Sequence, residues 1–543
     1  MSRLASLKTH YEELLNAISP TRRALAKLRA KWGKAGAKDS WLASRYFDLT
    51  RDDSARNFVD DRTWIDLEFP KIFAYLDATE SPVGGQTLFR KLREYVDDSD
   101  ELRAQYAAYD TLRSHKSLRE EIQLRLTPLQ ADSNASIADY IFGEPPKKPK
   151  YHHLLPVWSL FSLAVPIVVL TQSLPLFLWI AVLAANTVVI ARASMYLHRD
   201  TEALKDCYRL LDVADGLASV HSDSAALPEF SRLVEAIPLR KRARTALRLF
   251  CITRGVVAQS VYLWLNFLFL AELLAYVYTI DRFARVQNEL ASTFRLVGSL
   301  DAAIAVASFL EHRPDHCQPS ISDESSIDIA KGYHPLLDHP VKNSIQLNHR
   351  SALVTGSNMA GKTTFIKMIG ANIVLGRTLG FCFATEAAIP RSSVMASIRG
   401  DHSIESGKSH YFAEIEAVHS FIENARRGDC RVFVIDELFS GTNTVERLAA
   451  ARAVLESLSR NAQVLVTTHD IELQSVLADR YDLYHFREDP EIEGFFDYRL
   501  RSGATTARNA IRLLDRMEFP ADVVSAAMAY AEEVIEDDSP TDD

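Results

Sequence analysis

The chain has 543 residues, several times the roughly 100–200 residues of a typical domain, so we expect more than one domain. Hydrophobic residues make up 47% of the sequence and charged residues 24%, which excludes global disorder and a collagen-like fibre. The formal net charge of −9 argues against nucleic-acid binding through bulk positive charge. A mean hydropathy of −0.07 excludes a protein that lies mostly in a membrane, although local membrane segments remain compatible with it.

The five cysteines are widely spaced and include no C-x-x-C pair. Such spacing predicts neither a disulfide framework nor a zinc site, and it suits a reducing cytoplasmic compartment. The N-terminal segment is charged from its start and has no apolar core, so we expect no signal peptide.

Most of the first half of the chain has a helical pattern. Residues 2–31 carry apolar side chains at helical spacing, which predicts that the N-terminal segment 1–59 is helical. Leu, Ala, Arg and Glu dominate residues 84–126 and 281–311, and both segments are predicted to be long helices. We therefore expect a helical domain over residues 60–311.

A long apolar stretch interrupts this region. Residues 154–191 contain no Asp, Glu, Lys, Arg or His, and they are long enough for two short membrane-crossing helices of about 20 residues each. The polar turn at 171–175 would join these helices as a hairpin. Basic residues flank the stretch on both sides: Lys147, Lys148, Lys150, Arg192 and Arg199. By the positive-inside rule, both ends of the predicted hairpin face the cytoplasm.

A second apolar stretch, residues 255–280, is broken only by Glu272. Its sequence leaves several structures open: a tight hairpin, a re-entrant or interfacial segment, or a buried helix outside the membrane. The basic cluster at 240–248 precedes it and has three possible roles. It could contact DNA phosphates, contact anionic lipid headgroups, or form the ordinary flank of a membrane helix.

Residues 356–363 read GSNMAGKT, which matches the phosphate-binding motif G-x-x-x-x-G-K-[ST]. Apolar residues 352–354 predict a buried strand before it, and residues 362–375 predict a helix after it, which is the context the motif requires. Backbone N–H groups would bind phosphates, Lys362 would reach the outer phosphates of ATP, and the Thr363 hydroxyl would bind Mg²⁺. The predicted nucleotide-binding residues of this loop are Gly356, Ser357, Asn358, Met359, Ala360, Gly361, Lys362, Thr363 and Thr364.

Two further predicted strands end in polar residues. The segment 431–437 consists of Arg431, four apolar residues, Asp436 and Glu437, and an apolar strand that ends in two acids is expected of a Walker B element. Asp436 would hold Mg²⁺, and Glu437 would orient or deprotonate the attacking water. The run 464–468 ends in His469, which suits a sensor of the γ-phosphate.

A small polar turn, Ser-Gly-Lys-Ser at 406–409, comes just before an expected helix at 412–425. A second helix N-terminus that faces phosphates predicts a composite site, in which the loop of one subunit completes the nucleotide pocket of another. A plain surface loop is the alternative interpretation of the same segment.

Together these motifs resemble those of the MutS family of DNA mismatch-repair ATPases. The resemblance is carried by TGSNMAGKTT (355–364), GFCFATEAAIP (380–390), SGKSHYFAEI (406–415), VIDELFSGTNTVE (434–446) and VTTHDIEL (466–473). The segment KGYHP (331–335) is similar to the start of the family's ATPase domain and implies that Tyr333 and His334 lie near adenine. Residues 501–543 resemble the family's helix-turn-helix dimerisation element, followed here by an acidic tail.

The resemblance implies a homodimer that binds ATP and Mg²⁺ between its P-loop ATPase domains. Each ATPase domain would comprise residues 327–500 and follow a linker at 312–326. Ser409 of one subunit would reach the γ-phosphate held by Lys362 of the other. The implied catalytic residues are Glu437, His469, Lys362 and Ser409, and the implied Mg²⁺ ligands are Thr363 and Asp436.

More weakly, residues 60–311 resemble the family's helical core and lever domain. The expected fold class is therefore α + α/β, in which a helical lever domain with membrane-embedded helices is followed by a P-loop α/β domain. Residues 1–59 are too few to hold the family's mismatch-binding and connector domains, which we expect to be absent.

Two functions fit these features. The first is ATP-driven binding of mismatched, damaged or branched duplex DNA in repair, by a membrane-associated protein. The alternative is a membrane-anchored mechanochemical ATPase that acts on a protein or lipid partner without mismatch recognition. In both cases we expect lipid contacts at 154–191 and perhaps 255–280, a location at the cytoplasmic membrane, and the ATPase domain in the cytoplasm.

Overall fold

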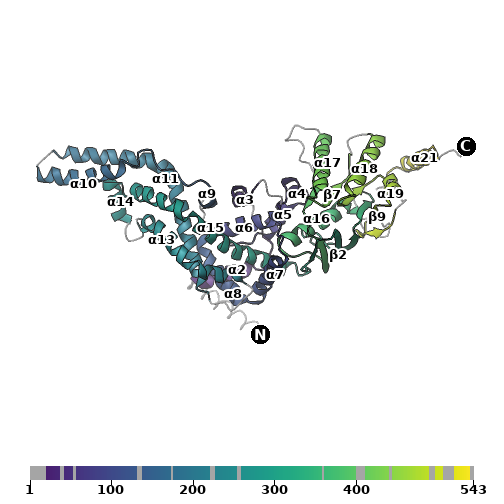
Figure 1. Cartoon of the computed structure of the whole chain (residues 1–543), viewed down its shortest axis with the longest axis horizontal. Coiled ribbons are helices and arrows are strands. Elements are labelled where there is room, and N and C mark those ends of the chain that lie inside the picture. Colours follow the sequence, from purple (N-terminus) through teal and green to yellow (C-terminus); the bar gives the residue numbers. More distant parts are fainter. Residues whose placement is uncertain are drawn as a thin grey trace. The chain divides into compact units, whose positions relative to one another are not determined.

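The computed structural model describes residues 20–36, 42–52, 57–130, 137–172, 175–220, 227–252, 259–357, 360–398, 410–439, 443–487, 496–504 and 519–537. The chain forms two compact units: unit 1 consists of residues 1–55, 73–92 and 104–314, and unit 2 of residues 56–72, 93–103 and 315–543. In the described residues, unit 1 is built of helices, whereas unit 2 combines helices with two β-sheets (Figure 1). The predicted combination of a helical part and an α/β part is therefore confirmed.

The first helices of the chain are short, and the single long helix expected over 84–126 is wrong. That segment forms three helices, because His115 leaves the helical conformation (φ −100°, ψ 75°) and the Asp98 carboxylate accepts a hydrogen bond from the Asp100 N–H (2.8 Å) at the start of a new helix. The helices are α2 (Pro20–Lys31), α3 (Arg45–Thr50), α4 (Asp61–Asp66), α5 (Phe69–Leu76), α6 (Pro82–Arg93), α7 (Ser99–Ser114), α8 (Lys116–Leu126), the 3₁₀ turn η1 (Thr127–Leu129) and α9 (Ile137–Phe142).

The remaining helices of unit 1 include α11 and α15, which have 42 residues each, and the helix expected at 281–311 lies within α15. These remaining helices are α10 (Leu155–Thr171), α11 (Phe177–Ala218), α12 (Pro228–Glu235), α13 (Ile237–Ile252), α14 (Gln259–Phe269) and α15 (Ala271–His312). In the described part of the chain, α15 is the one helix long and apolar enough to cross a membrane, and 78% of its apolar window is buried inside the protein. The buried core helices of soluble proteins can be equally long and apolar, so membrane insertion of α15 stays a prediction.

The basic cluster at 240–248 lies on α13, and two of its arginines are neutralised inside the fold. Arg240 is fully buried, and its Nε donates to the Asp215 carboxylate (2.8 Å). Arg244 forms ion pairs with Asp212 and Asp215, each at 2.7 Å. These bonds hold α13 against α11, and the burial of Arg240 disfavours its contact with phosphates or headgroups, two of the three roles left open for this cluster.

Unit 2 contains, within the described residues, a four-stranded sheet in the order β1-β5-β2-β3 and a six-stranded sheet in the order β10-β9-β4-β8-β7-β6. Strands β9, β4, β8, β7 and β6 are parallel, whereas β10 is antiparallel to β9. The strands are β1 (Ser320–Ser322), β2 (Ser326–Gly332), β3 (Asn343–Asn348), β4 (Ser351–Thr355), β5 (Glu386–Pro390), β6 (Val394–Ser397), β7 (Val432–Asp436), β8 (Gln463–Thr468), β9 (Tyr481–His485) and β10 (Arg501–Ser502).

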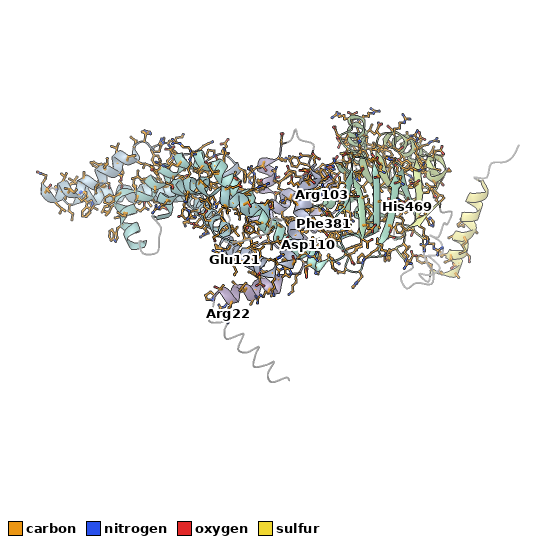
Figure 2. The ribbon with its side chains drawn as sticks, turned by 60° about the horizontal axis from the view of Figure 1, so that its bottom comes forward. Arg22, Arg103, Asp110, Glu121, Phe381 and His469 are labelled. Atoms are coloured by element: carbon orange, nitrogen blue, oxygen red, sulfur yellow. The ribbon has the colours of Figure 1, made fainter. Side chains whose placement is uncertain are left out.

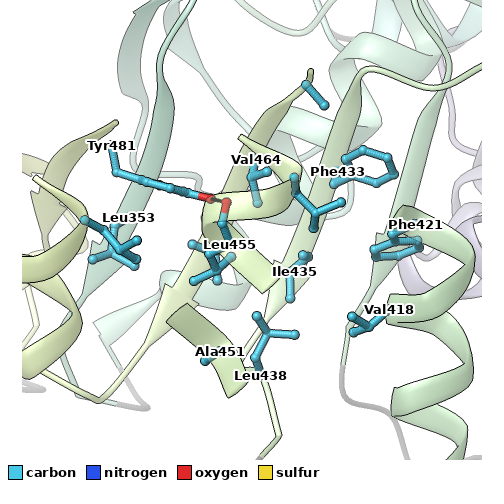
Figure 3. Packing of buried hydrophobic residues seen from close by; sticks show 14 of the residues in the cluster. Leu353, Val418, Phe421, Phe433, Ile435, Leu438, Ala451, Leu455, Val464 and Tyr481 are labelled. Atoms are coloured by element: carbon cyan, nitrogen blue, oxygen red, sulfur yellow. Dashed lines mark hydrogen bonds between the residues drawn. The ribbon is translucent and has the colours of Figure 1, made fainter. Parts of the chain in front are cut away.

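Helices cover the six-stranded sheet, and its central strands are buried along their whole length. These helices are α16 (Lys362–Thr378), α17 (His410–Arg427), α18 (Thr444–Leu458) and α19 (Glu472–Leu477), and α21 (Ala521–Asp537) follows the last strand. Figure 3 shows the core between the sheet and α17 and α18, where the ring centroids of Phe421 and Phe433 lie 5.0 Å apart. The Tyr481 hydroxyl reaches across this core and donates to the Leu455 carbonyl (2.8 Å). Strands buried on both faces are typical of a parallel sheet.

Residues from far upstream in the chain form hydrogen bonds with the edge strand β6. The Ala396 N–H donates to the Thr63 hydroxyl (2.9 Å), and the Val394 N–H donates to the Tyr95 hydroxyl (3.1 Å). The Ile398 N–H donates to Asp66 (2.9 Å), whose pKa rises to about 6 because its carboxyl is buried. These side-chain oxygens accept hydrogen bonds from backbone N–H groups that would be unpaired at an open sheet edge.

Candidate nucleotide-binding site

The candidate site lies at the carboxyl ends of three neighbouring parallel strands. β4 lies beside β8, and β8 lies beside β7, with Thr355 paired to Thr468 and Asp436 paired to Thr467. The polar residues that follow each strand therefore come to the same edge of the sheet, where ligands bind in open α/β sheets. His469, labelled in Figure 2, directly follows β8.

The loop between β4 and α16 depends on two glycines. Gly356 (φ 135°) and Gly361 (φ 98°) adopt conformations that other residues rarely accept, and a Cβ on Gly356 would lie 2.6 Å from the Phe486 carbonyl oxygen. Gly361 is the N-cap of α16, so the first N–H groups of that helix open toward the loop. The predicted phosphate-binding residues Asn358 and Met359 lie outside the described residues.

Lys362 is the first residue of α16, and its side chain is almost completely buried. Its Nζ donates to the Gly356 carbonyl (2.6 Å) and lies 3.3 Å from Nε2 and 3.5 Å from Nδ1 of His469. Burial lowers the pKa of Lys362 to about 8, against the opposing pull of the Glu437 and Asp436 carboxylates. The structure thus places this lysine beside the two acids predicted to act with it.

Thr363 and Asp436, the predicted Mg²⁺ ligands, are in direct contact. The Thr363 hydroxyl donates to Asp436 Oδ2 (2.9 Å), although the two residues lie 73 positions apart in the sequence. The other carboxylate oxygen accepts a hydrogen bond from the Thr467 hydroxyl. Hydroxyl and carboxylate oxygens are the ligands that Mg²⁺ takes in nucleotide sites, so this donor set fits the predicted ion.

Glu437 and His469 form a close pair, with Oε1 and Nε2 2.6 Å apart. This contact assigns a ring proton to Nε2, and the other ring nitrogen, Nδ1, lies 3.5 Å from the Lys362 Nζ. The Glu437 backbone has a positive φ of 54°, and its N–H donates to the Thr467 carbonyl (3.1 Å). Sparsely populated backbone conformations of this kind concentrate at functional sites. Glu437, His469 and Lys362 thus lie in one connected group.

A cavity of about 380 Å³ opens beside the loop, within the size range of small-ligand pockets. Tyr333 and His334, which were predicted to lie near adenine, contribute to its wall together with Phe486 and Tyr498. Tyr333 is buried, and its hydroxyl donates to the Asp315 carbonyl (2.9 Å). Tyr498 is far more exposed, at 45%, and offers the accessible aromatic surface.

Sequence reasoning did not identify Tyr498 or Phe486. The only available signal was the aromatic run at 495–498, since no motif marks these positions. A Cβ built on Gly361 would lie 3.2 Å from the Tyr498 ring, so this aromatic side chain stands directly beside the phosphate-binding loop. Its distance from that loop in sequence explains why only the fold brings the two together.

His334 is a neutral residue in the cavity wall. Burial lowers its pKa to about 4, so the ring is uncharged at neutral pH. Its Nδ1 accepts a hydrogen bond from the Leu336 N–H (3.4 Å). An uncharged imidazole in this position can contact a nucleotide base without adding charge to the site.

The predicted composite loop at 406–409, including Ser409, lies outside the described residues. The helix that follows it, α17, is connected to the Walker B segment, because the Phe439 N–H donates to the Glu414 carboxylate. Phe439 lies two residues after Glu437 and also has a positive φ of 57°. Glu414 lies within the motif at 406–415, to which the sequence assigned no role for this residue, and it links α17 to the candidate site.

Residues 352–535 match the family described as MutS domain V. Over 267 residues the chain is 30% identical to the DNA mismatch repair protein MutS of Natronomonas pharaonis, a match that covers 46% of this chain and 31% of that protein. It is 29% identical over 258 residues to the Endonuclease MutS2 of Leuconostoc mesenteroides (46% and 32%) and 28% identical over 255 residues to the MutS of Thermus aquaticus (46% and 31%). The chain thus spans about a third of the length of the curated relatives it matches.

Proposed function

We propose that this chain is a member of the MutS family, whose domain V matches residues 352–535, and that it binds and hydrolyses ATP at the carboxyl edge of its parallel sheet. One observation carries the proposal. A lysine, a hydroxyl, two carboxylates and a histidine from three separate segments meet there: Lys362, Thr363, Asp436, Glu437 and His469. Phosphoryl transfer needs this combination of positive charge, metal ligands and a base.

Each residue has a role that follows from its contacts. Lys362 and the N–H groups at the start of α16 would bind the phosphates of ATP. Thr363 and Asp436 would hold Mg²⁺, whose charge would offset that of the phosphates. Glu437 would accept a proton from the water that attacks the γ-phosphorus, and ADP would leave with the electrons of the broken P–O bond. His469, hydrogen-bonded to Glu437, would orient that carboxylate.

The substitution Glu437→Gln tests this assignment. It keeps the size of the side chain but removes the base, so ATP hydrolysis should fall by about 100-fold or more while ATP binding persists. Glu456→Gln, at a partly exposed position of α18, is the matched control and should keep normal turnover. Binding is measured with a fluorescent ATP analogue and turnover by phosphate release. Unchanged turnover in Glu437→Gln would remove this residue from the catalytic role.

We also propose a homodimer in which Ser409 completes the ATP site of the partner subunit. Subunit mixing tests this arrangement. Ser409→Ala and Lys362→Ala would each be inactive alone, but a mixed dimer would regain one site with both native residues. Activity restored by mixing supports a composite site, whereas no restoration means that each site is built within one subunit.

DNA is the proposed target at the level of the family, since two of the matched relatives are named DNA mismatch repair proteins. The helical unit would contact duplex or branched DNA and respond to ATP. Arg240 and Arg244 are engaged by aspartates, so exposed cations such as Lys241 and Arg248 would have to supply the phosphate contacts. Affinity for a mismatched duplex should fall as salt rises, and no binding at low salt would contradict this target.

One observation favours the alternative, a membrane-anchored ATPase that acts on a protein or lipid partner. Large apolar side chains are exposed along α10 and the first part of α11. Under this alternative the protein would lie at the cytoplasmic membrane with the ATPase domain in the cytoplasm. Recovery of the intact protein in the soluble fraction of lysed cells would contradict this location.

A further inference from the structure

The most exposed apolar surface of unit 1 lies on a helical hairpin. α10 and residues 177–193 of α11 pack side by side (Figure 1). Only four of the 17 residues of α10, all of them described, are buried. The exposed side chains of the hairpin include Val157, Leu160, Ile167 and Leu170 on α10 and Phe177 and Ile180 on α11. This surface needs a partner, because water is a poor solvent for so much contiguous apolar area.

The distribution of these side chains decides between a protein and a lipid partner. A helix that docks on another protein presents one apolar stripe and keeps a polar face toward water. On α10, exposed apolar residues occupy about half of the circumference, and the polar residues Ser159 and Ser162 point inward. A helix that is apolar on its exposed sides as well as its packed side fits surroundings of lipid.

The polar groups inside the hairpin are satisfied there. Asn186 of α11 is fully buried, its Oδ1 accepts from the Trp158 indole N–H (2.8 Å), and its Nδ2 donates to Ser162 Oγ (2.9 Å). The same Nδ2 lies 3.0 Å and 3.1 Å from the carbonyl oxygens of Phe267 and Leu268 at the end of α14.

The serines of α10 also donate hydrogen bonds to carbonyl groups at the end of α14. Ser162 donates to the Leu268 carbonyl (2.6 Å), and Ser159 donates to the Phe269 carbonyl (2.7 Å). Leu270 then adopts a left-handed conformation (φ 53°), which separates α14 from α15. A helix break among apolar residues leaves carbonyls without helical partners, and in hydrocarbon only protein groups can satisfy them. The hairpin supplies these donors.

The dimensions and flanking charges fit a bilayer. Seventeen helical residues span about 26 Å, close to the ~30 Å of a hydrocarbon core. Both ends of the hairpin lie at its base, where Lys147, Lys150 and Arg192 are exposed. These cations match the anionic headgroups of a lipid surface.

We infer that the α10–α11 hairpin inserts into an anionic lipid bilayer and that Asn186, Ser159 and Ser162 tie the end of α14 to it. The inference goes beyond ATP hydrolysis and does not depend on it. The hairpin is an anchor that enters and leaves on one side of the membrane, which places lipid, rather than another protein, against its exposed faces.

Flotation of the full-length protein with vesicles of phosphatidylcholine and phosphatidylglycerol tests the insertion. The double variant Leu160→Glu/Ile167→Glu charges two exposed positions, 67% and 58% accessible, and should fold normally. Two buried charges in hydrocarbon should lower vesicle partitioning by about 100-fold or more. Val234→Glu is the control, since it charges an exposed apolar residue (48% accessible) of α12, outside the hairpin and outside the candidate nucleotide site.

The outcomes separate the partners. Flotation of the wild-type protein and the control, with loss in the double variant and intact ATPase activity in all three, supports the anchor. A wild-type protein that stays with the soluble fraction overturns it. So does a wild-type oligomer that dissociates in the double variant without any vesicle binding, because a second copy of the chain would then cover the hairpin. Loss of ATPase activity in Glu437→Gln with normal flotation leaves the anchor unaffected.

Asn186→Leu tests the internal tie. It keeps the apolar exterior but removes the donor to two carbonyls of α14, so amide hydrogen exchange of the vesicle-bound protein over residues 264–270 should accelerate about tenfold or more. Thr187→Val is the matched control, because this neighbouring hydroxyl bonds only within its own helix, to the Leu183 carbonyl (2.8 Å). Equal exchange in the two variants would refute the role of Asn186.

Discussion

If the site binds ATP as proposed, buried Lys362 should make that binding sensitive to pH in a defined direction. Its pKa is lowered to about 8, chiefly by burial, so the free protein loses the lysine charge as the pH rises past 8. The phosphates of bound ATP favour the charged lysine and raise its pKa in the complex. ATP binding above pH 8 must therefore take up one proton, and affinity must fall there.

The size of the effect follows from the shift. With a pKa near 8, about 90% of the free protein carries the charged lysine at pH 7 and about 10% at pH 9, so the dissociation constant for ATP should rise about tenfold between these values. Isothermal titration calorimetry in two buffers of different ionisation enthalpy measures both the affinity and the proton uptake. Binding at pH 9 should take up close to one proton.

Lys362→Arg is the control, because a guanidinium keeps its charge to above pH 12. This variant should show little change in affinity between pH 7 and 9, whatever its absolute affinity. The reasoning is refuted if the wild-type dissociation constant is the same at both pH values, or if binding at pH 9 takes up no proton. Either result would mean that Lys362 is not the group that titrates on binding.

Three further results are expected. Tyr498→Ala should weaken ATP binding about tenfold but leave tripolyphosphate binding unchanged, and Tyr498→Phe should bind ATP normally, since stacking on a base is worth about 1–3 kcal/mol; equal losses for both ligands would exclude a base contact. Thr63→Val leaves the Ala396 N–H unpaired and should lower the stability of unit 2 by about 1–3 kcal/mol in chemical denaturation, whereas Thr63→Ser should not. Phe433→Ala empties a fully buried site and should cost about 3–5 kcal/mol in the same assay, so a cost below 1 kcal/mol would contradict the packing shown in Figure 3.

Local elements with strong patterns were predictable. The apolar run before Gly356 and the lysine after Gly361 specify a strand, a loop and a helix, and the structure has β4 and α16 there. The expected helices at 281–311 and 412–425 also lie within α15 and α17. These features depend on neighbouring residues, so the sequence carries them directly.

The sequence pattern did not predict where long helical segments are interrupted. The pattern over 84–126 looked continuous because apolar spacing persists through it, whereas the interruption at His115 depends on local backbone geometry. Likewise, the sequence placed a basic cluster at 240–248 but could not tell which arginines were exposed. Packing against α11 buries Arg240 beside Asp215, and that burial removes its charge from the surface.

The composition excluded a mostly membranous or strongly basic protein, and the motifs determined by themselves which residues are candidates for phosphate and Mg²⁺ chemistry. Only the tertiary structure decided which of them meet. Thr363 reaches Asp436 because β4, β8 and β7 are adjacent in a parallel sheet, although their order in the chain is different. The fold also added Tyr498 to the site and Thr63 to the edge of the sheet, because contacts between distant segments arise from sheet order and packing, which no local pattern records.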